Sequence, residues 1–260
     1  MESNQANKKS NLVFWLIVVA IILLIGGVVL FFKSTPSQSG KTVIINEGQP
    51  EAAVITFSSP KKTAHYESNT PAHGSVLAGA PVNIVLDFNF DLAPGSEISI
   101  KKDGKESGVG ATIIDDNKLA MRKNMDPNAP NGLYTVQYRA CWADGSCHDG
   151  SFQFAINKAI ANDFLDMRGK KEIVIDMVNI SFESQNVIIS RGTKVTWVNK
   201  DGVIHTVNSD AHPAHTYYLP QNSRNLKKGD TFSITFDQAG IYPYHCTPHA
   251  NRMIGTVLVQ

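Results

Sequence analysis

A thiol, an imidazole and a thioether occur close together near the end of the chain. Cys246, His249 and Met253 follow the spacing C-x2-H-x3-M, and a second imidazole, His205, lies about forty residues upstream. Two imidazoles, one thiolate and a weak axial thioether are the ligands of a blue-copper electron-transfer site. Soft sulfur suits Cu(I) and imidazole suits both oxidation states, so one rigid set of ligands can hold copper through a redox cycle. We therefore predict that these four side chains bind one type 1 copper ion.

Several strand-like stretches surround these residues. Residues 187–189, 194–199 and 254–259 have strand character, and residues 230–236 alternate apolar and polar side chains as a half-buried strand does. Lys200-Asp201-Gly202 forms a turn ahead of His205. Because the Cys246 loop and His205 must come from different strands, the expected scaffold is a sandwich of strands.

Residues 172–260 resemble the cupredoxins of the plastocyanin and amicyanin type. The residues that carry the resemblance, besides the four ligands, are Phe182, Gly192, Trp197, Asn199, Phe236, Gly240 and Tyr244. The resemblance implies a Greek-key β-sandwich that holds type 1 copper and passes single electrons. One departure is Thr206, where many relatives carry an Asn whose side chain braces the ligand loop. The Cys-to-Met spacing is also intermediate between the commonest family variants.

A second all-β module is expected over residues 62–157, because short strand-like runs there alternate with turn signals. Residues 64–77, 133–138 and 143–154 resemble the CopC copper-resistance family, whose members are periplasmic sandwiches that bind copper. The resemblance implies an immunoglobulin-like sandwich. It also implies a Cu(II) site whose matching residues here are His65, Asp144 and His148.

This second site departs from the family pattern at two of its three residues. His65 is internal and offers no free amine to a metal, and two extra residues separate Gly145 from His148. Imidazole and carboxylate still suit Cu(II). The alternative is a scaffold that kept its fold but not its metal, with these histidines facing solvent.

The chain has three cysteines, an odd number. Once Cys246 is assigned to copper, Cys141 and Cys147 remain, one on each side of a hairpin turn. A disulfide between them would close a short loop. The alternative is a pair of thiolate ligands beside His148 for Cu(I) or Zn(II). Disulfides persist outside the cytoplasm, which favours the first interpretation.

The compartment is predicted from the start of the chain. Residues 12–32 carry no charge and would form a helix of roughly 31 Å, long enough to cross a hydrocarbon core. We expect an uncleaved anchor; a cleaved signal peptide is the alternative. Lys8 and Lys9 would keep the N-terminus in the cytoplasm. We therefore expect a single-pass protein of the cell membrane with both β domains in the periplasm or at the cell surface.

The expected fold class is all-β, with two β-sandwich domains behind one N-terminal transmembrane helix. The predicted segments are a cytoplasmic tail (1–11), the anchor (12–32), a linker (33–61), the CopC-like sandwich (62–157), a connector (158–171) and the cupredoxin domain (172–260).

Composition and motifs exclude several classes of function. The net charge of +1 gives no electrostatic basis for binding nucleic acid. The chain has no nucleophilic triad, phosphate loop or H-x-H pair, and its ligand loop has a single cysteine, so we expect neither an enzyme nor a small-molecule substrate. The remaining classes are an electron carrier with a redox partner protein, and a copper sequestration or delivery protein with a copper chaperone or transporter as partner.

Three further histidines lie near the predicted copper loop in sequence. His212 and His215 fall between strands, where a solvated loop, a docking edge and an accessory metal site are the possible interpretations. His245 precedes Cys246, and on an alternating strand its side chain points to the opposite face. It is therefore not expected to bind the same metal.

Overall fold

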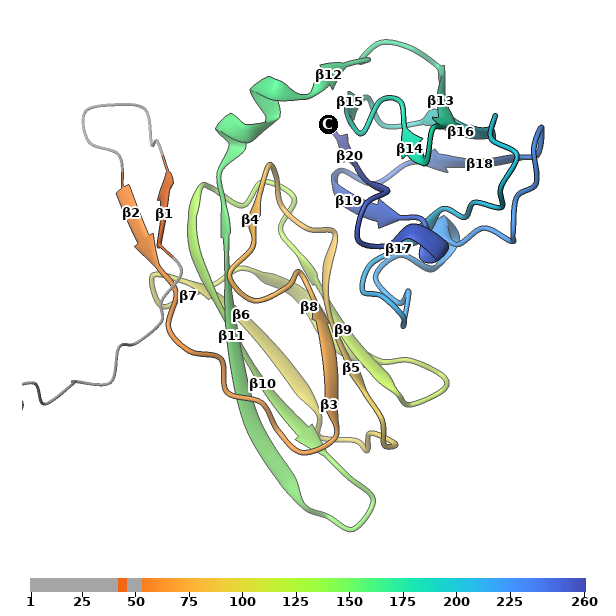
Figure 1. Ribbon diagram of the computed structural model, residues 1–260. Coiled ribbons are helices and arrows are strands. Elements are labelled where there is room, and N and C mark those ends of the chain that lie inside the picture. The colour runs from red at the N-terminus through yellow and green to blue at the C-terminus, as the bar shows by residue number, and fades with distance from the viewer. Residues whose placement is uncertain (1–41, 46–52) are drawn as a thin grey trace, which may run out of the picture. The chain divides into compact units, whose positions relative to one another are not determined.

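The structure is a computed structural model that describes residues 42–45 and 53–260. These residues are mostly β-strand and belong to one compact unit (Figure 1). The predicted tail (1–11) and anchor (12–32), and part of the predicted linker, lie outside the described residues. Within the described ranges, no helix has the length and apolar character needed to cross a bilayer.

Two sheets enclose the first core. The larger sheet has the order β4 (Val76–Leu77), β11 (Cys147–Ile156), β10 (Gly132–Cys141), β6 (Glu97–Lys102) and β7 (Lys105–Glu106). The smaller has the order β3 (Tyr66–Thr70), β5 (Asn83–Phe88), β9 (Ala120–Met125) and β8 (Gly108–Ile114). Strand β10 shows why they pack: Tyr134, Val136 and Tyr138 are buried, whereas the alternate residues Gln137 and Arg139 are exposed. The expected β-rich module is therefore present.

The range expected to be a linker contains a hairpin. Strands β1 (Thr42–Ile45) and β2 (Ala53–Thr56) pair antiparallel with each other. Ile55 and Phe57 then pack against Ala155 of β11. The chain entering the first sheet pair is thus attached to it by apolar contacts.

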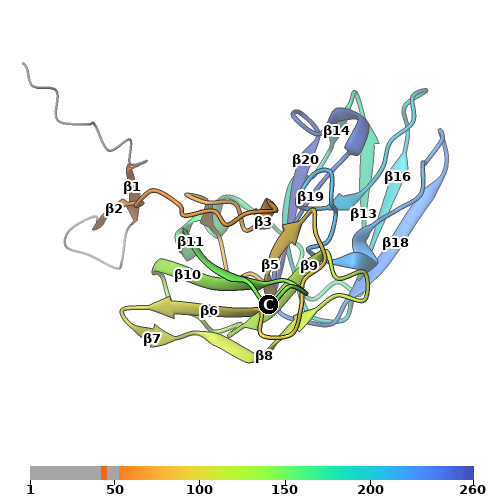
Figure 2. The ribbon, with the colours of Figure 1, turned by 90° about the horizontal axis from the view of Figure 1, so that it is seen from below.

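Two more sheets enclose the second core. One has the order β14 (Ser181–Phe182), β13 (Glu172–Val178), β16 (Thr193–Asn199) and β18 (Thr231–Phe236), and Figure 2 shows the last three side by side. The other has the order β12 (Leu165–Asp166), β15 (Asn186–Ile189), β20 (Ile254–Val259), β19 (Gly240–His245) and β17 (Asn208–Ser209). Trp197 of β16 and Tyr244 of β19 meet in this core with ring centroids 5.3 Å apart. The expected β-rich character of this region is confirmed as well.

Short 3-10 helices connect some of these strands. The predicted connector forms η1 (Lys158–Asp163) and then β12, which joins the second sheet pair beside β15. The others are η2 (Leu219–Gln221) and η3 (Thr247–His249). The last of these forms part of the loop that contains the predicted copper ligands.

The two sheet pairs share buried contacts. The hydroxyl of Tyr217, a residue in the segment between β17 and η2, accepts a hydrogen bond from the Val82 amide at 2.9 Å and donates to the Ile241 carbonyl at 2.6 Å. Gly240 at the start of β19 has φ +146°, and a Cβ there would lie 2.6 Å from a methyl of Val82. The close approach therefore requires glycine at this position.

We predict that Tyr217→Phe destabilises the protein. The buried Val82 amide and Ile241 carbonyl would lose a partner, which costs about 1–3 kcal/mol of unfolding free energy. Urea unfolding of the two proteins measures the difference. Tyr242→Phe is the matched control, because its hydroxyl donates only to the nearby Gln238 carbonyl. Equal midpoints for Tyr217→Phe and wild type would contradict this role.

Candidate metal centre

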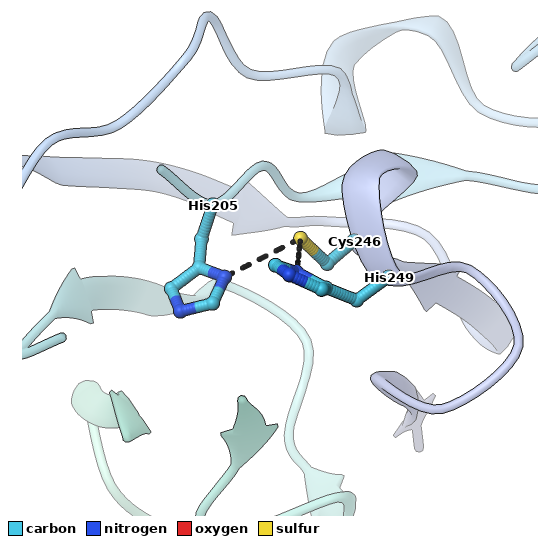
Figure 3. A group of neighbouring side chains, drawn as sticks. All are labelled: His205, Cys246 and His249. Atoms are coloured by element: carbon cyan, nitrogen blue, oxygen red, sulfur yellow. Dashed lines mark hydrogen bonds between the residues drawn. The ribbon is translucent and has the colours of Figure 1, made fainter. Parts of the chain in front are cut away.

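Three of the four predicted ligands converge in the second sheet pair. Figure 3 shows His205, Cys246 and His249 pointing toward one another. The Cys246 sulfur lies 3.5 Å from Nδ1 of His205 and 3.5 Å from Nδ1 of His249. The two imidazole ring centroids are 5.2 Å apart. Residues from two separate segments therefore present three ligand atoms to one point.

These separations fit a metal ion. A Zn²⁺ ion bound about 2.3 Å from sulfur and about 2.05 Å from nitrogen, at a tetrahedral angle, holds those two atoms about 3.6 Å apart. Both sulfur-to-nitrogen separations agree with this value to about 0.1 Å. The donor set of one soft sulfur and two imidazoles is the one that copper electron-transfer sites use. The residues present therefore fit a copper ion.

The fourth predicted ligand belongs to the same loop. The Met253 side chain is fully buried in the second core. Its carbonyl accepts a hydrogen bond from the Cys246 amide at 2.9 Å, and its own amide donates to the His249 carbonyl at 2.9 Å. These bonds, together with helix η3, close the segment from residue 246 to 253 into a compact loop.

The thiol lies in a protected environment. Cys246 is fully buried, and burial raises the pKa of its thiol. The Thr206 amide donates a hydrogen bond to the sulfur at 3.3 Å, which opposes that increase by stabilising the thiolate. The same amide is therefore placed to support a metal-bound thiolate.

A carboxylate that we did not predict from the sequence orients His205. Oδ2 of Asp201 lies 2.9 Å from Nε2 of His205, on the side of the ring away from Cys246. Asp201 also accepts hydrogen bonds from the amides of Asn179 and Ile180, and the Ile180 bond is the main cause of its lowered pKa. Carboxylates in this position fix the tautomer of a ligating histidine and make it more basic. The sequence places Asp201 four residues before His205, but we interpreted Asp201 only as part of a turn.

Thr206 takes over the bracing role expected of an Asn. Its hydroxyl oxygen accepts a hydrogen bond from the Thr247 amide at 2.8 Å, so it holds the residue next to Cys246. The departure from the family pattern at this position therefore keeps a side-chain brace on the ligand loop.

A second group of histidines combines His245 of β19 with two residues of the loop that follows β17. His212, His215 and His245 place a ring nitrogen each within 4.8 Å of the others. As expected from the alternation, His245 is not part of the Cys246 group. Burial and the neighbouring His245 and His212 rings lower the pKa of His215 to about 4, so this ring is neutral near pH 7.

Two of the three CopC-like candidates contact the same aromatic ring. The Trp142 ring packs against both His65 and His148, each with ring centroids 5.4 Å from it. The Asp144 carboxylate accepts hydrogen bonds from the amide and hydroxyl of Ser146 within its own turn. Among the described residues these three side chains form no cluster of ligand atoms. A metal site there stays a prediction.

A disulfide joins Cys141 and Cys147. They are the last residue of β10 and the first of β11, and they are direct partners in the sheet register. Their sulfurs are thus bonded to each other and not free to act as thiolate ligands beside His148.

Two family models match the chain in the order expected. Residues 66–157 match the CopC domain, and residues 170–260 match the copper binding proteins of the plastocyanin/azurin family. The recognition of both modules from the sequence is therefore confirmed.

Individual relatives match the second region. The amicyanin of Paracoccus denitrificans is 35% identical over 88 residues, which cover 34% of this chain and 65% of the relative. The plastocyanin of Scenedesmus fuscus is 38% identical over 84 residues, covering 30% of this chain and 86% of the relative. The match thus spans less than two thirds of the amicyanin's length but most of the plastocyanin's.

Solved structures match the same region. A Cu(I) form of a methionine mutant of amicyanin is 32% identical, covers 35% of this chain and 83% of that chain, and has a TM-score of 0.30. Copper is the cofactor that membership of this family establishes for the chain.

We predict that Asp201→Asn weakens copper binding. Loss of the carboxylate partner of a ligating histidine typically lowers metal affinity by about 10–100-fold, and the Asn side chain preserves the shape. Competition with a Cu(I) chelator measures this affinity. Asp237→Asn, which changes an exposed carboxylate after β18, is the control. An Asp201→Asn variant with wild-type affinity would show that the contact does not orient His205.

We predict that Thr206→Val releases copper faster. The Thr247 amide would lose its acceptor, and one hydrogen bond is worth about 0.5–1.5 kcal/mol, or roughly 2–10-fold in rate. The rate of copper transfer to excess chelator is the measurement. Thr206→Ser keeps the hydroxyl and should behave like wild type. Equal rates of copper release from the Val and Ser variants would show that the Thr206 hydroxyl does not brace the ligand loop.

Proposed function

We propose that this chain, which belongs through residues 170–260 to the plastocyanin/azurin family of copper binding proteins, is an electron carrier. We further propose that it is tethered to a membrane. In this proposal one type 1 copper ion is held by His205, Cys246, His249 and Met253. The domain folds as a Greek-key sandwich, preceded by an immunoglobulin-like CopC sandwich.

The convergence of three ligand atoms carries this proposal. Two imidazole nitrogens lie 3.5 Å from a buried sulfur, which is the separation that a shared ion needs. Bound copper supplies the ability to gain and lose one electron. The residues around it keep the site rigid, because Asp201 fixes one imidazole and Thr206 fixes the loop that carries the other ligands.

The site also has an accessible side. His205 and Cys246 are buried, whereas His249 is only half-buried and lies at the end of η3. Ile204 precedes His205 in the chain and keeps its large apolar side chain exposed. Exposed apolar side chains of this kind suit the docking of a redox partner protein. His249 is therefore the proposed entry and exit point for electrons.

We propose that the protein acts outside the cytoplasm. Residues 12–32 would anchor it in the cell membrane, with the N-terminus inside and both β domains in the periplasm or at the cell surface. The Cys141–Cys147 disulfide supports an oxidising compartment.

Copper sequestration or delivery is the second candidate function. The CopC domain match over residues 66–157 favours it, because it adds a second copper-protein family to the chain. Its partner would be a copper chaperone or transporter instead of a redox protein.

We predict that the full chain, loaded with Cu(II), is intensely blue. Thiolate coordination by Cys246 is the source of the colour, so Cys246→Ser should abolish it. A variant with both Cys141→Ser and Cys147→Ser is the control and should stay blue, because the disulfide lies in the first sheet pair. A colourless wild-type protein that binds no copper would overturn the proposed site.

The redox behaviour of the blue protein distinguishes the two functions. A carrier should pass through repeated oxidation and reduction with all its copper retained. A delivery protein should lose copper readily to a competing chelator in either oxidation state. Ready loss of copper would favour delivery over electron transfer as the function. The assignment of the copper ligands would stay the same.

A further inference from the structure

The three-histidine cluster, made of His212, His215 and His245, has the construction of a metal site. We propose that these imidazoles bind a second divalent transition-metal ion, and that Cu(II) binds most tightly. This site is separate from the Cys246 site and would exist whether or not Cys246 holds copper.

The spacing of the ring nitrogens supports the proposal. Nε2 of His215 lies 3.1 Å from Nε2 of His245. Two imidazole nitrogens at about 2.05 Å from one ion are about 2.9 Å apart at the right angle of a tetragonal site and about 3.3 Å apart at a tetrahedral angle. The His212 ring centroid lies 5.5 Å from that of His215 and 5.3 Å from that of His245. A hydrogen bond would account for the short distance between His215 and His245. It would not account for the His212 ring, which lies beside both of them.

A carboxylate orients the most buried of the three rings. Oδ1 of Asp210 lies 3.0 Å from Nδ1 of His245, so the ring N–H is donated to the carboxylate. The lone pair of Nε2 is then directed at His215 and away from Asp210. This is the arrangement that ligating histidines adopt with their outer partners, and Asp201 has the same relation to His205. His245 is only 3% exposed, so its ring is fixed before any ion arrives.

The loop that carries the other two histidines is held in place by hydrogen bonds. The carbonyl of His215 accepts hydrogen bonds from the Ser209 hydroxyl and from the side-chain NH2 group of Asn222, and the backbone amide of His215 donates to the Ala211 carbonyl at 2.7 Å. His215 has φ +54°, a left-handed conformation that few residues other than glycine adopt. A freely solvated loop, one interpretation of the sequence, does not need such a conformation. These bonds hold His215 where its ring reaches His245.

The cluster leaves room for an external ligand. Three imidazoles supply three positions, and His212 is exposed to solvent. Metal sites with three protein ligands keep a further position for water or a small molecule. Imidazole accepts copper, zinc and nickel, and the general order of affinities places Cu(II) first. The site is therefore an open one instead of a closed structural one.

The test is a copper titration of the full chain. The wild type should bind one more Cu(II) than the variant carrying both His212→Ala and His215→Ala, and that variant should stay blue. Electron paramagnetic resonance of the extra copper should show nitrogen couplings from imidazoles and no thiolate character. The Cys246→Ser protein should keep this signal, which separates failure of this site from failure of the blue site.

Controls address other copper sites and misfolding. A variant with both His65→Ala and His148→Ala removes the same number of imidazoles from the first sheet pair and should keep the extra ion and its signal. His212→Ala alone changes only an exposed side chain and should lower the affinity for the extra Cu(II) by at least about tenfold. Unchanged stoichiometry and an unchanged signal in the His212→Ala, His215→Ala protein would overturn the proposal. Loss of the signal in the His65, His148 control would do so too, because it would place the ion elsewhere.

Discussion

The alternation of side chains along β19 is the constraint on which both histidine groups depend. Tyr242, Tyr244 and Cys246 point into the core of the second sheet pair. His245 points the other way and meets Asp210 and the loop histidines. Because the side-chain period of a strand is two, a shift of one residue would move the thiol out of the core and the imidazole into it. The register of β19 against β20 and β17 therefore fixes both sites together.

The main-chain edge of β19 that faces away from β20 also attaches the first sheet pair to the second. The Ile241 amide donates to the Ala80 carbonyl, and its carbonyl accepts the Tyr217 hydroxyl. Asp87 of β5 accepts a hydrogen bond from Thr216, a neighbour of the loop histidines. The segment from residue 210 to 217 thus contributes both to the histidine cluster and to the contact between the sheet pairs. The CopC-like region supports the loop that carries His212 and His215, whatever its own affinity for metal.

The candidate copper site has a different set of supporting contacts from the one that the family resemblance implies. Thr206 holds the amide of Thr247 with a hydroxyl, where many relatives are expected to use a side-chain amide. Its backbone N–H also reaches the Cys246 sulfur. One residue therefore supports the thiolate and braces the ligand loop. The chemistry of the metal determines which residue types can act as ligands. The residues that hold those ligands in place can differ, as Thr206 does from the Asn of many relatives.

The sequence by itself determined the features that depend on local spacing. The C-x2-H-x3-M loop and the alternation through Tyr244, His245 and Cys246 are visible in a short window, and they predicted the ligand types and the opposite direction of His245. The all-β character and the order of the two modules followed from strand patterns and family resemblance. Tertiary structure alone decided three further points: that Asp201 turns back onto His205, that His212 and His215 reach His245, and that Trp142 packs against His65 and His148. Each of these depends on where a loop lies relative to distant strands. That position is set by long-range packing and hydrogen bonds, which leave no periodic signal in the chain.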